Sequence, residues 1–312
     1  MRFEKKDLLD IHSLDVNEIT MILDTAQGMK EISERPVKKV PTLRGKTIIL
    51  FFQEPSTRTK LSFEIAAKRL SADTVSIAKS SSSIVKGETL IDTARNLEAM
   101  KPDVIVLRHS SSGGAHVIAK RVGCSVINAG DGIHAHPSQA LLDMMSIREK
   151  KGSLKGLNIS IVGDISHSRV ARSDIIGFSK MGAIVSVCAP HTMIPNGIET
   201  LGCRVAKNMD ACVEGADVIM MLRIQKERQG NILFPSEREY ASLYGLNSAR
   251  VKLAQKDVIV MHPGPMNRGV EISSEVADSP CSMILDQVTN GVALRMALFY
   301  ILAGGSRHAD SD

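Results

Sequence analysis

The stretch "FFQEPSTRTKLSFE", residues 51–64, joins an apolar run to a helix-like pattern through a short polar segment. The run that ends here, 46–52 ("KTIILFF"), is short and rich in β-branched and aromatic residues, which predicts a buried strand. From Thr59 onward apolar residues recur at helical spacing, and Pro55 prevents one continuous element across the junction. The polar segment therefore lies between the carboxyl end of a strand and the amino end of a helix.

Two interpretations fit this polar segment. Backbone N–H groups at a helix start are unpaired and favour an anion. Ser56, Thr57 and Thr59 add hydroxyl donors and Arg58 adds a charged guanidinium, so the four residues could form a phosphate cradle. The same residues also fit a plain helix cap, with Ser56 or Thr57 as the N-cap and Arg58 in solvent. Spacing alone leaves both interpretations open.

Strand-like and helix-like patterns alternate along the whole chain. The predicted strands are 46–52, 73–78, 104–108, 125–129, 157–163, 183–189, 217–223 and 257–262. The predicted helices include 59–70, 89–100, 114–122, 168–181 and 236–255. This alternation predicts an α/β protein of two domains, each a parallel sheet flanked by helices.

We expect the first domain at 1–137, completed by a carboxyl-terminal helix at 285–303, and the second domain at 151–284. A helix at 138–150 is expected to link them, and Pro137 at its start suits a first helical turn. The tail 304–312 has the composition of a disordered segment.

Composition narrows the class of protein. The chain has 312 residues, of which 43% are hydrophobic and 23% charged, as in ordinary globular proteins. The net charge of +5 suits small anionic ligands and is too small to indicate nucleic acid binding. The amino terminus lacks the apolar core of a signal peptide, and no apolar run approaches membrane-spanning length. The five cysteines form no CxxC pair, so they indicate neither a disulfide framework nor a zinc site, and we expect reduced thiols in the cytoplasm.

Basic, hydroxyl and histidine side chains follow strand after strand. Arg108 ends one predicted strand, Arg223 ends another, and "GDGIHAHPSQ" (130–139) follows a third. Ligands of open α/β sheets bind beyond the carboxyl ends of the strands. The sequence therefore predicts a binding site for small anions there. The stretch "IVGD" (161–164) lacks the G-x-G-x-x-G pattern, so a dinucleotide is not expected.

Residues 56–59 (Ser-Thr-Arg-Thr) together with "HPSQALLD" (136–143) resemble the carbamoyltransferases. Three further stretches are similar to the aspartate branch of that family: "KGETLIDTARNLEAM" (86–100), "RIQKER" (223–228) and "HPGPMNRGVEI" (262–272). The ornithine branch carries a cysteine after the equivalent of His262 and a Ser-Met-Gly motif. This chain has Pro263 at the first position and no Ser-Met-Gly. The resemblance covers about residues 3–303.

The resemblance implies a role for each matching residue. The phosphate of carbamoyl phosphate would be held by Ser56, Thr57, Arg58 and Thr59, and its carbamoyl end by Arg108, His136 and Gln139. The carboxylates of aspartate would be bound by Arg169 and Arg223, with Gln225 beside them. Gly264 and Pro265 would offer backbone carbonyls near the attacking amine. Ser82 and Lys86 would come from a neighbouring subunit, with Lys86 also counted among the aspartate-binding residues.

Two positions depart from the pattern of some relatives. Val170 stands where some have Thr, and Gly264 stands where some have Leu. The first change removes a hydroxyl, and the second leaves the backbone carbonyl in place. The resemblance assigns no role to His109 or His134, and we expect His262 only to shape its loop.

The resemblance implies transfer of the carbamoyl group of carbamoyl phosphate to the α-amine of L-aspartate, an early step of pyrimidine synthesis. Arg58, Thr59, Arg108 and His136 would be the catalytic residues, with no cofactor and no metal. The expected assembly is a homotrimer, and the sequence leaves open whether a regulatory chain or a dihydroorotase joins it. Two alternatives stay open: a carbamoyltransferase with another amine acceptor, and an anion-binding scaffold without catalysis.

Overall fold

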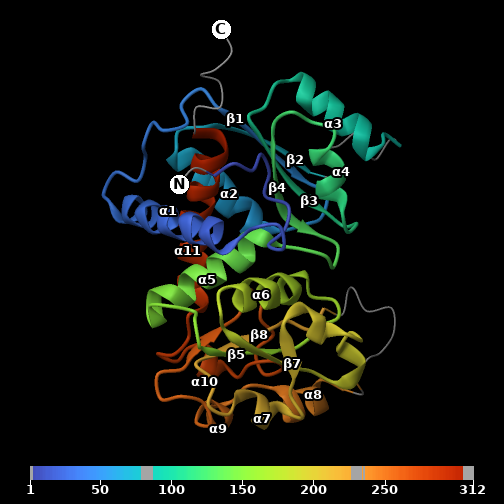
Figure 1. The fold of residues 1–312 in the computed structure, drawn as a ribbon, viewed down its shortest axis with the longest axis vertical. Helices are drawn as coiled ribbons and strands as arrows, with labels where there is room; N and C mark the ends of the chain where they lie inside the picture. The colour runs from blue at the N-terminus through green and yellow to red at the C-terminus, as the bar shows by residue number, and fades with distance from the viewer. Residues whose placement is uncertain (1–2, 79–86, 226–233, 235, 305–312) are drawn as a thin grey trace. The chain divides into compact units, whose positions relative to one another are not determined.

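The computed structural model describes residues 3–78, 87–225, 234 and 236–304 (Figure 1). The chain divides into two compact units, each described here by itself. Unit 1 comprises Met1–Met145 and Thr289–Asp312, and unit 2 comprises Ser146–Val288. The unit boundaries fall within two helices, α5 (Pro137–Lys151) and α11 (Ile284–Phe299).

Unit 1 is built on a parallel sheet of four strands in the order β2-β1-β3-β4. The strands are β1 (Thr47–Phe52), β2 (Asp73–Ala78), β3 (Val104–His109) and β4 (Ser125–Asp131). Each matches a strand predicted from the sequence. In the central strands β1 and β3 continuous apolar runs form strands because helices cover both faces of the sheet, whereas residues 73–77 of the edge strand β2 are exposed or partly exposed.

The helices of unit 1 pack on both faces of this sheet (Figure 1). They are α1 (Val16–Glu34), α2 (Thr57–Arg69), α3 (Leu90–Ala99), α4 (Gly114–Ala119) and the carboxyl-terminal part of α11, which continues into the π-helical turn Tyr300–Gly304. Alternate residues such as Ile49 and Phe51 form one apolar cluster with α3 and α4. On other elements of the unit, Phe63 of α2 meets Phe299 of α11 with ring centroids 5.6 Å apart.

Helix α1 is absent from the sequence-based prediction, although a recognisable start signal precedes it. Asp15 is its N-cap and accepts from the backbone N–H of Glu18 at 2.8 Å. The Glu18 carboxylate accepts in return from the backbone N–H of Asp15 at 2.9 Å. This capping box satisfies two otherwise unpaired donors at the helix start.

Unit 2 is built on a parallel sheet of five strands in the order β7-β6-β5-β8-β9. The strands are β5 (Asn158–Val162), β6 (Ile184–Cys188), β7 (Cys203–Val205), β8 (Val218–Met221) and β9 (Ile259–Met261). The short strand β7, at the sheet edge, is the one strand in this sheet that the prediction lacks. The helices are α6 (Arg169–Lys180), α7 (Met209–Val213), α8 (Glu237–Tyr244), α9 (Ser248–Val251) and α10 (Ser274–Ala277).

The prediction of a single helix at 236–255 is wrong, because the helix is interrupted between α8 and α9. The backbone N–H of Leu246 donates to the Glu271 carbonyl at 2.9 Å instead of continuing the helix. Gly245 allows a close approach of chains, since a Cβ there would lie 2.5 Å from the Ala241 oxygen and 2.8 Å from the Val270 oxygen. Asn247 then caps α9 by accepting from the Arg250 N–H at 3.0 Å.

The cores of both units are mainly aliphatic, as the low aromatic content requires. Within the described ranges, no helix combines the length and apolarity needed to cross a bilayer.

Candidate active site

The amino terminus of α2 lies directly after β1, and its backbone donors are not used by a side-chain cap. Ser56 is the N-cap residue, yet its hydroxyl makes no cap hydrogen bond. By contrast, Asp15, Thr89 and Ser168 each cap their own helices through the side chain. The structure therefore does not support Ser56 as a side-chain cap, and the phosphate cradle at residues 56–59 stays a prediction. Its N–H groups carry the partial positive charge of a helix start.

The Arg108 side chain, near the end of β3, is held by one contact from strand β4 and one from the loop that follows β1. Its Nη1 donates to the Ala129 carbonyl of β4 at 3.2 Å, and its Nη2 lies 3.0 Å from Glu54 Oε1 in the loop after β1. The Arg108 and Glu54 side chains are only 11% and 21% exposed. The ion pair holds a guanidinium beside the α2 amino terminus because β1 and β3 are adjacent.

His136 and Gln139 stand at the start of α5, which begins at Pro137. His136 is 4% exposed, and its Nδ1 lies 3.5 Å from the Ser138 hydroxyl. The Gln139 Nε2 donates to both carboxylate oxygens of Asp143, at 3.1 and 3.2 Å. A carboxylate only accepts, so the amide nitrogen of Gln139 must face it. The Gln139 carbonyl oxygen is consequently the atom left to address a ligand.

Asp143 in turn supports a buried cation. Burial lowers the pKa of Arg295 to about 10, and the negative charge of Asp143 opposes that shift. The Arg295 guanidinium also lies 4.9 Å from the centre of the Phe63 ring, in a cation–π arrangement. Asp143 was not singled out from the sequence. Its place four residues after Gln139, on the same face of α5, is the pattern that could have identified it.

The loop between β4 and α5 is held by the fully buried carboxylate of Asp131. It accepts from the backbone N–H groups of Gly113 at 2.6 Å and Ala135 at 3.0 Å, and from Asn128 Nδ2 at 2.9 Å. Burial alone would raise the pKa of Asp131, but hydrogen bonds from His134, Asn128 and Gly113 outweigh it and lower the pKa. The ionised carboxylate thus fixes the loop that leads to His136.

In unit 2 the ends of the adjacent strands β5 and β8 bring two predicted segments together. The Gln225 Nε2 donates to the His167 carbonyl at 3.1 Å, and the Gln225 backbone N–H approaches Asp164 Oδ2 at 3.4 Å. His167 Nδ1 lies 2.8 Å from Asp164 Oδ1. Segments 164–169 and 223–225 are therefore neighbours. Arg169 is 3% exposed and Arg223 is partly buried.

The segment after β9 is organised by His262. Its Nδ1 accepts from the Gly264 N–H at 2.8 Å, and its Nε2 lies 3.3 Å from Glu271 Oε1. Its backbone N–H donates to Gln287 Oε1 at 2.9 Å. Both ring nitrogens are thus engaged inside unit 2, which agrees with the expectation that His262 only shapes the loop presenting Gly264 and Pro265. Ser82 and Lys86 lie outside the described residues.

The chain matches two family descriptions that together span nearly all of it. The first, "Aspartate/ornithine carbamoyltransferase, carbamoyl-P binding domain", matches residues 6–149. The second, the "Asp/Orn binding domain" of the same family, matches residues 155–302. The chain therefore belongs to the aspartate/ornithine carbamoyltransferase family. Residues 56–59 fall in the first match, and Arg169 and Arg223 fall in the second.

Among similar sequences, two relatives with high identity carry the name of the aspartate branch of this family. A protein of Desulforapulum autotrophicum named aspartate carbamoyltransferase catalytic subunit is 78% identical over 311 residues, covering 100% of both chains. A protein of the same name from Desulfosudis oleivorans is 63% identical, covering 99% of each chain.

Solved structures include both branches of the family. The ornithine carbamoyltransferase of Pyrococcus furiosus is 32% identical, with a TM-score of 0.88, and the likeness covers 98% of this chain and 99% of that one. The Trypanosoma cruzi aspartate transcarbamoylase, solved in complex with carbamoyl phosphate and aspartate, is 27% identical with a TM-score of 0.84, covering 95% of each chain. The fold is therefore common to both branches, and sequence identity carries the distinction between them.

Proposed function

We propose that this chain transfers the carbamoyl group of carbamoyl phosphate to the α-amine of L-aspartate. The products are N-carbamoyl-L-aspartate and phosphate, and the reaction is an early step of de novo pyrimidine synthesis. The observation that carries the proposal is the α2 amino terminus, where the Ser56 hydroxyl is not spent on a cap and the Arg108 guanidinium is held on the adjacent strand. Relatives that are 61–78% identical and share the aspartate carbamoyltransferase name support the choice of acceptor.

The phosphate of carbamoyl phosphate binds at residues 56–59 in this proposal. Ser56, Thr57 and Thr59 donate hydroxyl hydrogen bonds, and Arg58 meets the phosphate and the bridging oxygen. Phosphate gains negative charge as it leaves, and Arg58 and the helix amino terminus stabilise that charge most in the transition state.

The carbamoyl end is addressed by Arg108, His136 and Gln139. The Gln139 carbonyl oxygen, left over by the bond from its amide nitrogen to Asp143, accepts from the carbamoyl NH₂. Attack by the amine creates a tetrahedral oxyanion, and Thr59, Arg108 and His136 donate to it. Removing one such donor typically lowers kcat by about 10²–10³-fold.

Aspartate binds through paired charges. Two guanidinium groups, Arg169 and Arg223, meet its two carboxylates, with Gln225 and Lys86 beside them. The second cation would repel the side-chain amine of ornithine, which is why we favour a dicarboxylate acceptor. The carbonyl groups of Gly264 and Pro265 accept from the attacking amine. The amine loses its proton to the departing phosphate, so the bond changes balance without a separate base.

We further propose that the working form is a cytoplasmic homotrimer in which Ser82 and Lys86 complete the site of a neighbouring subunit. Mixing Lys86→Ala chains with Arg58→Ala chains tests this, because some hybrid sites would then carry neither change. Partial recovery of activity in mixed trimers is expected. Inactive mixtures, with hybrid trimers verified by native mass measurement, would contradict shared sites. The same mass measurement on protein from its own cells reports any regulatory chain or dihydroorotase.

One assay separates the proposed acceptor from the alternatives. Carbamoyl phosphate is supplied with L-aspartate and, separately, with L-ornithine, and phosphate release and the carbamoylated product are measured. Carbamoyl-aspartate as the sole product supports the proposal. Carbamoyl-ornithine would place the chain with the ornithine enzymes, which are also among its structural neighbours. No product with either acceptor would favour a non-catalytic anion-binding protein.

A further inference from the structure

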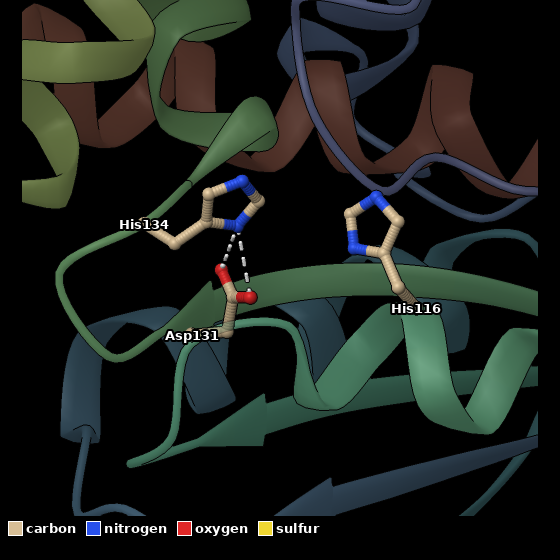
Figure 2. Close-up of side chains that lie close together, drawn as sticks. All are labelled: His116, Asp131 and His134. Carbon is tan, nitrogen blue, oxygen red and sulfur yellow. Dashed lines mark hydrogen bonds and ion pairs between the residues drawn. The ribbon is translucent and has the colours of Figure 1, made fainter.

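Three side chains with metal-binding atoms converge in unit 1, apart from the proposed substrate residues (Figure 2). His116 comes from α4, Asp131 ends β4, and His134 lies on the loop before α5. One ligand atom from each lies within 4.8 Å of the other two. His134 Nδ1 is 3.0 Å from Asp131 Oδ2, and the two imidazole rings have centroids 5.6 Å apart. Asp131 and His134 are three residues apart, but His116 precedes them by 15 residues or more on another element, so the sequence shows no familiar metal-binding spacing.

His116 is oriented as a metal-binding histidine usually is. Its Nε2 lies 3.0 Å from Asp10 Oδ2, so the neutral ring carries its proton on Nε2 and a lone pair on Nδ1. The Nδ1 atom is buried and has no hydrogen-bond partner among the described residues. Figure 2 shows it turned toward His134 and Asp131. A carboxylate on the far nitrogen and an open lone pair on the near one are the arrangement found in carboxylate–histidine–metal sites.

Asp131 can accept an ion without losing its structural bonds. Each carboxylate oxygen has about two acceptor positions. Oδ1 accepts from Asn128 and Ala135, and Oδ2 accepts from Gly113. His134 Nδ1 lies 3.0 Å from Oδ2 and 3.2 Å from Oδ1, and Oδ2 is the oxygen with a position remaining. If His134 Nδ1 gives up its proton and binds a metal ion, the ion can occupy the remaining acceptor position on Asp131 Oδ2.

The dimensions also suit a small divalent ion. Bonds of about 2.0–2.1 Å in a tetrahedral site separate the ligand atoms by roughly 3.3–3.4 Å. The His134–Asp131 pair is already near that separation, and the widest pair must close by at most about 1.5 Å. The His134 side chain is 43% exposed, which gives it room to turn. That exposure also leaves solvent access to a fourth position.

We propose that His116, Asp131 and His134 form a binding site for a first-row divalent transition metal ion, with Zn²⁺ as the reference ion. Two imidazoles and one carboxylate favour such ions over Mg²⁺ and Ca²⁺, which prefer all-oxygen shells. Asp10 orients His116 through the contact between its carboxylate and His116 Nε2, on the side of the ring away from the ion. The bound ion ties the β4–α5 loop to α4, immediately before His136.

The test is metal binding by the full-length chain carrying no histidine tag. After treatment with a chelator and its removal, Co²⁺ is titrated and its visible absorption recorded, and Zn²⁺ is then added to displace it. One ion per chain is expected. His116→Ala and His134→Ala should each weaken binding by more than about 100-fold, and Asp10→Asn by about 10–100-fold. Circular dichroism and the melting temperature verify that each variant is folded.

His191→Ala is the matched control, because His191 is an exposed histidine in unit 2. It should bind the ion as the unchanged chain does. Failure of the unchanged chain to bind Co²⁺ or Zn²⁺, or full binding by folded His116→Ala protein, would overturn the proposal. Binding is measured without substrate, so this result is independent of the carbamoyl-transfer assay.

Discussion

Gly163→Ala is expected to damage aspartate binding, although Gly163 is not among the proposed substrate-binding residues. Gly163 follows β5, and its N–H donates to the Cys188 carbonyl at 3.1 Å. Its φ is +134°, and a Cβ there would lie 2.6 Å from the Leu222 oxygen and 2.8 Å from Leu222 Cβ. The Leu222 N–H is bonded to the Val162 carbonyl at 2.7 Å, so the two strand ends cannot separate freely. Arg223 is the next residue along the chain.

The size of the effect follows from that geometry. Ordinary contacts of a Cβ begin at 3.4 Å, so Leu222 must move by 3.4 − 2.6 = 0.8 Å. A displacement of about 1 Å in a substrate-positioning group can lower the rate about 10²-fold. The unfavourable φ costs on the order of 1–3 kcal/mol of stability in addition. We therefore expect kcat/KM for aspartate to fall about 10–10²-fold, with the KM for carbamoyl phosphate little changed.

Steady-state kinetics with each substrate varied in turn provides the measurement. Gly215→Ala is the control, because Gly215 also has a positive φ (+66°) in unit 2, whereas the nearest atom to an added Cβ is 4.0 Å away. That variant should lose some stability and keep its aspartate kinetics. A folded Gly163→Ala protein with kcat/KM for aspartate equal to that of Gly215→Ala would refute the reasoning.

Three further predictions concern single side chains. Arg58→Ala should lower kcat about 10²–10³-fold while the melting temperature is kept, because Arg58 is exposed at the α2 start; phosphate release near the normal rate would remove the cradle from the mechanism. Asp15→Ala should cost about 0.5–2 kcal/mol of stability by breaking the capping box, and Asp15→Ser should recover most of it in urea unfolding; equal losses in both would argue against capping. Burial, with a smaller contribution from Glu98, raises the pKa of the Cys124 thiol to about 12 from an ordinary 9.0. Because the thiolate is the reactive form, alkylation of Cys124 at pH 8 should be about 10³-fold slower in the native protein than in urea. Peptide mass mapping follows the alkylation. Fast labelling of Cys124 in the native chain would contradict that.

Local patterns predicted most of the sheet residues correctly. The runs at 46–52 and 104–108 became β1 and β3 because a central parallel strand covered on both faces needs a continuous apolar run, which is visible in the sequence. Strand β7 has only three residues, too few for any periodicity. The helical pattern at 236–255 misled because periodicity cannot show that Leu246 pairs with the distant Glu271 backbone.

For the candidate site, the sequence pointed to the proposed ligand-binding residues but not to the residues that support them. Residues 56–59, Arg108, His136 and Gln139 were selected because they follow adjacent strands or match family motifs. Their supporting partners were not selected: Glu54 holds Arg108, and Asp143 holds Gln139. These partners are ordinary acidic residues in sequence, and only the contacts distinguish them. Asp164 is a third such supporting residue: it accepts from the Gln225 backbone N–H and lies within hydrogen-bond distance of His167 Nδ1.

The sequence by itself determined the types of the main elements and the anionic character of the ligands, because periodicity, caps and charge are properties of neighbouring residues. Tertiary structure alone decided which side chains meet. Asp10, His116 and the local pair of Asp131 and His134 belong to three separate segments, and only the packing of α4 beside β4 brings His116 to that pair. The physical reason is that strand order and helix docking are set by burial over the whole chain, and a short stretch of sequence carries no record of its partner.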